Sequence, residues 1–395
     1  MIPVTKPFLP RLGEFEEYVN SIWERKWLTN NGPLVNELEL KLKDYLDVKH
    51  LLYVANGTIA LQIAIKALGL TGEIITTPFS FVATTSSIVW EGCKPIFVDI
   101  DEETFNIDPK KIEEAITPLT SAILATHVYG NPCEIDAIQV IAERHNLKVI
   151  YDGAHCFGTK YKNRSVFEYG DVSTTSFHAT KLFHTIEGGA VFTKCPDLLK
   201  KMASMRNFGH NGPDEFSEIG INGKNCEFHA AMGLCNLKQV DEILDKRRLL
   251  SYYYWKSLSS LEAKYPKLNS DLDYNYAYFP VLFNNEILMH KCLKALESEK
   301  IYCRRYFYPS LSTLPFVSPS HMPVCESISK RILCLPLYHT LTSSDLDLIT
   351  RVILRVQNYD NSTFIEDSEQ VSRSNYTSQN LAFAQVGPVK EPIIN

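Results

Sequence analysis

Between residues 50 and 195, short apolar runs alternate with longer segments whose hydrophobic residues recur at helical spacing. The runs predicted to be strands are HLLYVA, EIITT, PIFVDI, AILATHV, KVIYDG, STTSFH and GAVFT. The segments predicted to be helices are GTIALQIAIKALGL, SFVATTSSIVWEG, DPKKIEEAITPLT and EIDAIQVIAERHN. Strands that are apolar throughout and are joined by helices predict an α/β fold, with a mostly parallel sheet covered on both faces.

Beyond residue 225 the pattern predicts one or two long amphipathic helices, followed by a mixture of short elements. YAYFPVLF and IYCRRYFYP are predicted to be strands, and MHKCLKALESEK and SSDLDLITRVILRV to be helices. From about residue 357, Ser, Asn, Gln and acidic residues predominate without a sustained period. We therefore expect a large domain over 1–245, a small α+β C-terminal domain over 246–356, and a mobile tail over 357–395 that contains LAFAQV.

Composition narrows the classes of protein that fit. The chain has 395 residues, 45% of them hydrophobic, and a formal net charge of −6 without a long basic run, which argues against nucleic-acid binding. The ten cysteines show no C-x-x-C pair and no metal-ligand spacing, so we expect free thiols, no metal and a reducing cytoplasm. The N-terminus lacks the apolar core of a signal peptide, and no apolar stretch reaches membrane-spanning length. These features predict a cytoplasmic protein without a membrane partner.

Four predicted loops at the carboxyl ends of strands carry residues suited to ligand binding, and ligands of open α/β sheets bind at this edge. Gly57 and Thr58 open a helix directly after a strand, where backbone N–H groups can hold a phosphate. An ordinary turn capped by Asn56 or Thr58 fits this segment equally well. In TTPFSFVATT a phenylalanine can stack on a planar ring, although core packing is the commoner role of phenylalanine.

The other two loops carry ionisable residues. Asp152 ends an apolar strand, so its carboxylate needs either a protonated pyridine nitrogen or an arginine or helix cap, and His155 lies close enough for the same ligand. Ser176 and Lys181 follow another strand, where a hydroxyl can contact a phosphate while Lys181 is either a surface lysine or one that forms a Schiff base. A phosphate site, a ring stack, a pyridinium partner and a reactive lysine together are what pyridoxal phosphate requires.

The succession NGTIAL, TPFSFVAT, YDGAHCFG, SFHATKLFHTIEGGA, GINGKNCEFHAAMGL and RRYFYP resembles the DegT/DnrJ/EryC1/StrS family of sugar aminotransferases, over roughly residues 1–355. The resemblance implies the aspartate-aminotransferase-like fold (fold type I) and pyridoxal 5'-phosphate as cofactor. It implies roles for Lys181 as the lysine bound to the cofactor, Asp152 as the pyridinium partner, Phe81 as the stacking ring, His155 near the 3-hydroxyl, and Gly57, Thr58 and Ser176 as phosphate contacts. Asn222 matches an asparagine that reaches the phosphate of the neighbouring subunit, which implies a homodimer with shared sites.

The reaction is also implied by the resemblance. The dehydratase branch of the family has histidine where this chain has Lys181, so transamination, usually with L-glutamate as donor, is expected. VTKPFLP and WLTNNGP are most similar to the branch that aminates carbon 4 of dTDP-4-keto-6-deoxyglucose, giving dTDP-4-amino-4,6-dideoxyglucose for O-antigen or related polysaccharides. Thr29, Asn30 and Tyr306 are candidates for the sugar-nucleotide pocket. Amination at carbon 3 of an isomeric sugar and a non-catalytic cofactor-binding regulator stay open as alternatives, although the set of Lys181, Asp152 and Ser176 favours an enzyme.

Overall fold

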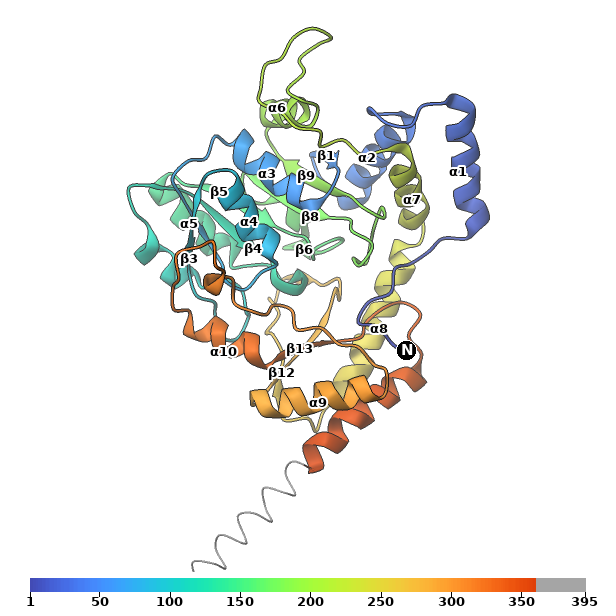
Figure 1. Cartoon of the computed structure of the whole chain (residues 1–395), viewed down its shortest axis with the longest axis vertical. Helices are drawn as coiled ribbons and strands as arrows, with labels where there is room; N and C mark the ends of the chain where they lie inside the picture. The colour runs from blue at the N-terminus through green and yellow to red at the C-terminus, as the bar shows by residue number, and fades with distance from the viewer. Residues whose placement is uncertain (360–395) are drawn as a thin grey trace, which may run out of the picture.

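The computed structural model describes residues 1–359, and a seven-stranded sheet forms its centre (Figure 1). In spatial order its strands are β1 (His50–Val54), β9 (Gly189–Thr193), β8 (Val172–Ser176), β5 (Lys148–Asp152), β4 (Thr120–Thr126), β2 (Glu73–Thr76) and β3 (Lys94–Phe97). Strand β9 is antiparallel to both of its neighbours, and the other pairs are parallel. The predicted mostly parallel α/β sheet is thereby confirmed.

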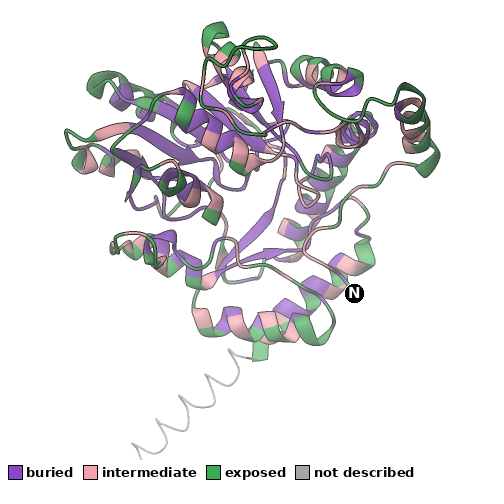
Figure 2. Ribbon diagram, turned by 45° about the horizontal axis from the view of Figure 1, so that its top comes forward, coloured by how far each residue is buried: buried purple, intermediate pink, exposed green. Residues whose placement is uncertain are grey.

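Helices cover both faces of this sheet because successive strand residues alternate between two hydrophobic clusters. In β1, Leu52 and Val54 belong to the cluster that includes residues of α3 (Gly57–Ala67), α4 (Val82–Trp90) and α6 (Pro196–Arg206). Leu51 and Tyr53 belong to the opposite cluster, with α2 (Pro33–Leu46), α5 (Ile135–His145) and α7 (Glu227–Leu237). Figure 2 shows the strands buried between these layers. The helix α1 (Leu12–Arg25) packs against α7 at one edge of the molecule.

Several short elements complete the large part of the molecule. They are β6 (Lys160–Tyr161), β7 (Arg164–Ser165) and β11 (Leu272–Asp273), which form a small sheet, and the 3-10 turns η1 (Pro109–Lys111), η2 (Glu113–Ala115), η3 (Val128–Gly130), η4 (Val166–Glu168) and η5 (Leu311–Thr313). The helix predicted for DPKKIEEAITPLT is wrong, since this segment forms only η1 and η2. Pro118 disfavours helical backbone at Thr117, and the chain is already extended at Ile116.

The smaller part of the molecule is α+β, as predicted, and lies below the large sheet in Figure 1. Helix α8 (Val240–Ser257) runs into it and is followed by the antiparallel strands β10 (Ala263–Lys264), β12 (Phe279–Phe283) and β13 (Ile332–Leu335), the helices α9 (Glu286–Ser298) and α10 (Pro323–Arg331), and helical residues 343–359. The strand predicted for IYCRRYFYP is wrong: only Ile301 and Arg304 make isolated bridges. The chain leaves the sheet there and passes the cavity described below.

The N-terminus joins the smaller part. Ile2 pairs with Ile301, and its side chain belongs to the core of that part. Helix α8 spans both cores, because Val240 packs in the larger one and Tyr254 in the smaller one. The boundary between 1–245 and 246–356 lies inside this helix and stays a prediction.

Most of the predicted tail, 357–395, lies outside the described residues, and all of LAFAQV does. Residues 357–359 are described and are helical, and buried Gln357 bonds to the backbone of Ser260 and Glu262. For these three residues the tail assignment is wrong, because the last helix continues through them. No helix among residues 1–359 is long and apolar enough to cross a membrane.

Candidate active site

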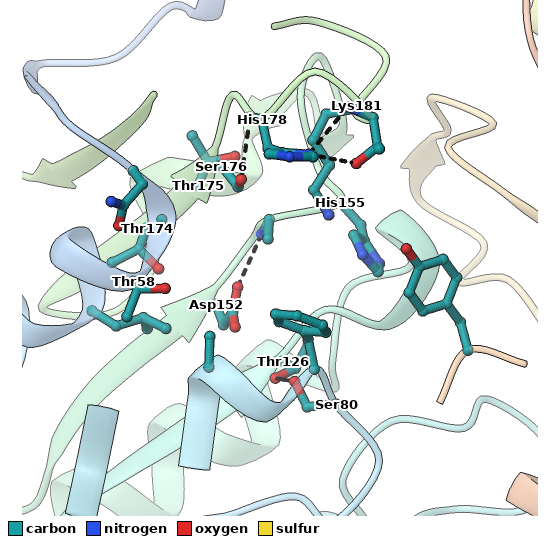
Figure 3. Close-up of a pocket in the computed structure, with 18 of the residues that line it drawn as sticks. Thr58, Ser80, Thr126, Asp152, His155, Thr174, Thr175, Ser176, His178 and Lys181 are labelled. Carbon is teal, nitrogen blue, oxygen red and sulfur yellow. Dashed lines mark hydrogen bonds between the residues drawn. The ribbon is translucent and has the colours of Figure 1, made fainter. Parts of the chain in front are cut away.

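A cavity of about 390 Å³ opens at the carboxyl edge of the sheet (Figure 3). The residues that line it come from the β1–α3 turn, the β2–α4 turn, the ends of β4, β5 and β8, and the segment 304–307 of the smaller part. Of the residues predicted for the site, it brings together Gly57, Thr58, Phe81, Asp152, His155, Ser176, Lys181 and Tyr306. They converge because the parallel strands β1, β2, β4, β5 and β8 all end at the same edge.

Asp152 is the last residue of β5 and is buried at the floor of the cavity. Its Oδ2 accepts a hydrogen bond from Thr84 Oγ1 at 2.8 Å, and its Oδ1 accepts one from the Ala154 N–H at 3.1 Å. Burial raises the pKa of Asp152, while these hydrogen bonds and the charge of Lys181 act in the opposite direction. An arginine or helix cap, the alternative partner considered for this carboxylate, is absent among its hydrogen bonds and ion pairs with residues 1–359. The carboxylate is therefore oriented and partly compensated, and it can still accept a cationic ligand.

Thr84 belongs to a network of hydroxyl groups that the sequence did not predict. Ser80 Oγ lies 2.7 Å from Thr84 Oγ1 and 2.9 Å from Thr126 Oγ1, and all three residues are buried. The network joins the start of α4 to the ends of β4 and β5. Its only sequence signal is the small-residue helix that follows TTPFSF, and nothing in that pattern points to Asp152.

The start of α3 forms the second wall of the cavity. Asn56 caps this helix, since its Oδ1 accepts the Ile59 N–H at 2.8 Å. Capping and phosphate binding were alternatives for this turn, but the cap uses Asn56 and leaves Gly57 and Thr58 facing the cavity. A Cβ on Gly57 would lie 3.0 Å from Ser176 Cβ, so the turn and the end of β8 are in contact. Backbone N–H groups of a first helical turn beside two hydroxyls suit a phosphate.

Lys181 lies in the turn that follows β8, and its backbone N–H bonds to the His178 carbonyl at 2.9 Å. Burial lowers the pKa of Lys181, and the charge of Arg304 adds to this effect, while Tyr306 and Asp152 oppose it. Within residues 1–359 the Lys181 ammonium makes no hydrogen bond or ion pair. The interpretation of Lys181 as an ordinary surface lysine is therefore wrong, and its amine is directed into a cavity with a raised neutral fraction.

Two aromatic rings flank the same space. Phe79 is fully buried in the core, whereas Phe81 is 52% exposed at the N-cap of α4 and lines the cavity, so core packing does not account for Phe81. The His155 ring packs parallel to Phe307 with centroids 5.7 Å apart. Burial lowers the pKa of His155 well below its ordinary value, which keeps the ring neutral, and its buried Nδ1 has no partner within residues 1–359. That nitrogen is available to a ligand.

Three further polar residues that line the cavity were not predicted as site residues: His178, Glu187 and Arg304. His178 Nε2 lies 3.5 Å from Glu187 Oε1, and the Arg304 guanidinium lies 4.7 Å from the centre of the Tyr306 ring. Burial raises the pKa of Tyr306 to about 12, so its phenol stays protonated. The motifs SFHATKLFHTIEGGA and RRYFYP contain these residues, but a sequence pattern does not show which side chains face a cavity.

Three predicted residues do not line this cavity. Thr29 and Asn30 are exposed in the turn between α1 and α2, and Asn222 is exposed where it bridges to Asn207. Their predicted roles therefore require a substrate that extends beyond the cavity, or a second subunit. The site residues and their roles stay predictions.

A buried carboxylate, a helix N-terminus suited to phosphate and a lysine of lowered pKa lie together at the carboxyl edge of this sheet. Such a set of residues suits the transfer of amino groups.

Comparison with known proteins gives the family. The model of the DegT/DnrJ/EryC1/StrS aminotransferase family matches residues 12–354, and the chain belongs to this family of enzymes. The dTDP-4-amino-4,6-dideoxy-D-glucose transaminase of Escherichia coli is 41% identical to the chain over 366 residues, covering 89% of this chain and 98% of the relative. A transaminase of the same name from Shigella dysenteriae is 42% identical over 361 residues, with coverage of 90% and 98%. The crystal structure of DesI in the presence of its TDP-sugar product matches with a TM-score of 0.87 at 30% identity, covering 93% and 95%.

Proposed function

We propose that this protein is a pyridoxal 5'-phosphate-dependent transaminase that moves an amino group from L-glutamate to carbon 4 of a dTDP-linked 4-keto-6-deoxyglucose. The product is dTDP-4-amino-4,6-dideoxyglucose, a precursor for O-antigen or related polysaccharides. Two observations support the proposal: identities of 41% and 42% to transaminases named for this product, and a lysine and a carboxylate that face one cavity.

The residues that line the cavity fit the cofactor. The first turn of α3, with Thr58 and Ser176, suits its phosphate, and buried Asp152 suits a protonated pyridine nitrogen. The Nδ1 of His155, which has no partner within residues 1–359, suits a polar substituent of the ring, and exposed Phe81 suits its face. When bound, pyridoxal phosphate supplies an aldehyde that accepts an amino group and a protonated ring that withdraws electrons.

The chain's own residues supply binding and proton transfer. Lys181 would hold the cofactor through Nζ, and its amine, whose pKa burial lowers, would take up and return a proton. Asp152 stabilises a positive charge on the ring, and Thr84 fixes the direction of its carboxylate. The neutral His155 orients the ring without adding a second charge beside Lys181.

The test of the substrate is a panel of keto-sugar nucleotides offered with L-glutamate, with the aminated carbon identified by NMR. We expect amination at carbon 4 of the dTDP-4-keto-6-deoxy sugar. Amination at carbon 3 of an isomeric dTDP sugar would contradict the proposed position and would favour the related 3-aminotransferases. Turnover of a sugar with another base only would contradict the proposed nucleotide.

The test of the cofactor site is borohydride reduction of the purified protein, followed by peptide mass mapping. We expect the reduced cofactor on Lys181. In Lys181→Ala, cofactor should still bind without a covalent bond, and transamination should fall by roughly 10²–10⁴-fold because the proton carrier is lost. Attachment to any other lysine would refute the assignment.

A further inference from the structure

Arg304 is a cation in the wall of the cavity to which the proposed cofactor chemistry gives no role. Two hydrogen bonds to Cys334 hold its backbone: its N–H donates to the Cys334 carbonyl at 3.2 Å, and its own carbonyl accepts the Cys334 N–H at 2.8 Å. Its guanidinium lies 4.7 Å from the centre of the Tyr306 ring. Strand β13 therefore fixes the backbone of Arg304, and its exposed side chain lies over an aromatic face in the wall of the cavity.

The Arg304 guanidinium lacks an anionic partner within the described residues 1–359. The neighbouring Arg305 differs, because its guanidinium donates to the Lys330 carbonyl at 3.1 Å, lies 3.6 Å from the centre of the Tyr308 ring and does not line the cavity. The two adjacent arginines thus face different surroundings, and only Arg304 has its donors free for a ligand.

The other charges of the cavity are already in use. Asp152 accepts hydrogen bonds at both of its oxygens, and Glu187 lies beside His178 across the mouth. Lys181 is committed to the cofactor under the proposed function. Among residues 1–359, an incoming anion therefore finds one cation of the cavity with free donors, and a guanidinium binds a carboxylate through two parallel hydrogen bonds.

We propose that Arg304 binds the α-carboxylate of the amino donor. The inference rests on the proposed function, and it makes Arg304 a residue that determines donor specificity. The α-amine and the α-carboxylate of an amino acid share one carbon, so an amine that reaches Lys181 places its carboxylate in the same cavity. The diphosphate of a sugar nucleotide is attached to carbon 1, across the sugar ring from carbon 4, and lies farther from the reacting atoms.

The experiment follows the two half-reactions separately by the absorbance of the cofactor. Wild type, Arg304→Gln and Arg304→Lys react with L-glutamate, with its α-amide (isoglutamine) and with its γ-amide (glutamine). The reverse half-reaction uses the amino sugar nucleotide as the amine. Arg305→Gln is the matched control, because it removes the adjacent guanidinium without changing the cavity.

We expect Arg304→Gln to raise the half-saturating glutamate concentration by roughly ten- to a hundredfold, the loss of one charge-assisted contact, with a smaller change in maximal rate. Glutamine should show the same loss, while isoglutamine, already poor with wild type, should react equally with both proteins. The amino sugar half-reaction should be unchanged, and Arg304→Lys should recover part of the affinity. Arg305→Gln should match wild type.

Equal losses for glutamate and isoglutamine would overturn the assignment. A loss of affinity confined to the amino sugar half-reaction would also overturn the assignment, and would indicate that Arg304 binds the diphosphate of the sugar nucleotide. A wild-type protein that binds the cofactor and reacts with no amino acid would refute the proposed function and the inference together. If wild type reacts with glutamate and Arg304→Gln reacts with it equally well, the inference alone is refuted.

Discussion

At the residue scale, Asp152 and Lys181 show how one fold gives two side chains properties that they lack in water. Burial raises the pKa of the Asp152 carboxyl and lowers the pKa of the Lys181 amine, so both charged forms are disfavoured at the same cavity. A cationic ring partner for Asp152 and a covalent bond for Lys181 relieve both costs. Residues whose charged forms burial disfavours are thereby suited to holding a ligand.

The first prediction concerns the stability of the cofactor-free protein. Because the pKa of Asp152 is higher in the folded state than its ordinary 3.8, the folded state binds the proton more tightly than the unfolded chain. The contribution of Asp152 to stability is therefore most favourable below pH 3.8 and is lost as pH rises through the folded pKa. Asp152→Asn lacks this loss, so the variant should gain stability relative to wild type as pH increases over that range. Urea unfolding of both proteins at a series of pH values measures it, and a constant difference would contradict the prediction.

The second prediction concerns the same substitution in the cofactor-loaded protein. An amide does not stabilise a pyridinium charge as a carboxylate does, so the half-reaction of Asp152→Asn with glutamate should slow by roughly a hundredfold or more. Cofactor affinity should fall less, because the phosphate contacts remain. Stopped-flow absorbance measures the rate and equilibrium dialysis the affinity. Near-normal turnover would show that Asp152 is structural.

At the element scale, the N-termini of two helices organise the site and its surroundings. Helix α4 begins beside the cavity and supplies Thr84 to Asp152. Helix α7 begins with Glu227, whose carboxylate accepts the Leu34 and Val35 N–H groups at 3.0 and 2.9 Å and lies 3.5 Å from Arg25. This buried carboxylate caps α2 and fixes the turn that carries Thr29 and Asn30.

The third prediction compares two adjacent threonines of α4. Thr84→Val removes the hydrogen bond to Asp152 and should weaken cofactor binding by about 1–2 kcal/mol. Thr85 is equally buried, but its hydroxyl has no partner within residues 1–359, so Thr85→Val should leave binding unchanged and stability equal or higher. Cofactor titration and thermal unfolding distinguish them. Equal effects of the two substitutions would argue against the hydroxyl network.

The fourth prediction concerns the cap of α2. Glu227→Gln keeps the shape of the side chain but turns an acceptor into a donor beside two N–H groups, and should destabilise the fold by about 2–4 kcal/mol. Glu37→Gln is the control, because Glu37 is in an exposed pair with Lys41 on the same helix, and should cost less than about 0.5 kcal/mol. Denaturant unfolding measures both. A Glu227 variant as stable as its control would contradict the capping role.

At the scale of the whole molecule, the cavity exists only where the large sheet meets the smaller part. Asp152 and Lys181 come from the large sheet, while Arg304 and Tyr306 come from the chain beside β13. The segment around Asn222 is exposed and carries the apolar side chains Phe208, Phe216, Ile219 and Ile221 on its surface. Apolar side chains gathered in this way suit an interface with a second copy of the chain.

The fifth prediction follows from that segment. The protein should sediment as a dimer that the cofactor stabilises, and Ile219→Asp should shift it towards monomer and lower its activity in parallel. Ile287→Asp, at an equally exposed apolar position on α9, is the control and should stay dimeric. A cross-linker attached at Asn222→Cys should reach the cofactor site of the other subunit. A monomeric, active wild type would refute the shared site.

The sequence by itself determined the strands of the large sheet and the edge at which the ligand residues meet. Apolar runs of strand length separated by helices leave few folds available, and parallel strands bring their carboxyl ends together. For this reason Gly57, Asp152, Ser176 and Lys181 could be predicted to share a site. The family motifs selected Phe81 as the stacking ring and gave His155 its role near the 3-hydroxyl, since no periodicity distinguishes these rings from core residues.

Only the tertiary structure decided which side chains complete the site. Thr84 reaches Asp152, and Arg304 reaches the cavity of Lys181, across chain separations that no local pattern records. The same holds for Phe79 and Phe81, since two residues of one loop separate into core and cavity only when α4 packs on the sheet. Side-chain partners depend on the packing of elements against one another, whereas the strands and the edge where they end depend on the alternation along the chain.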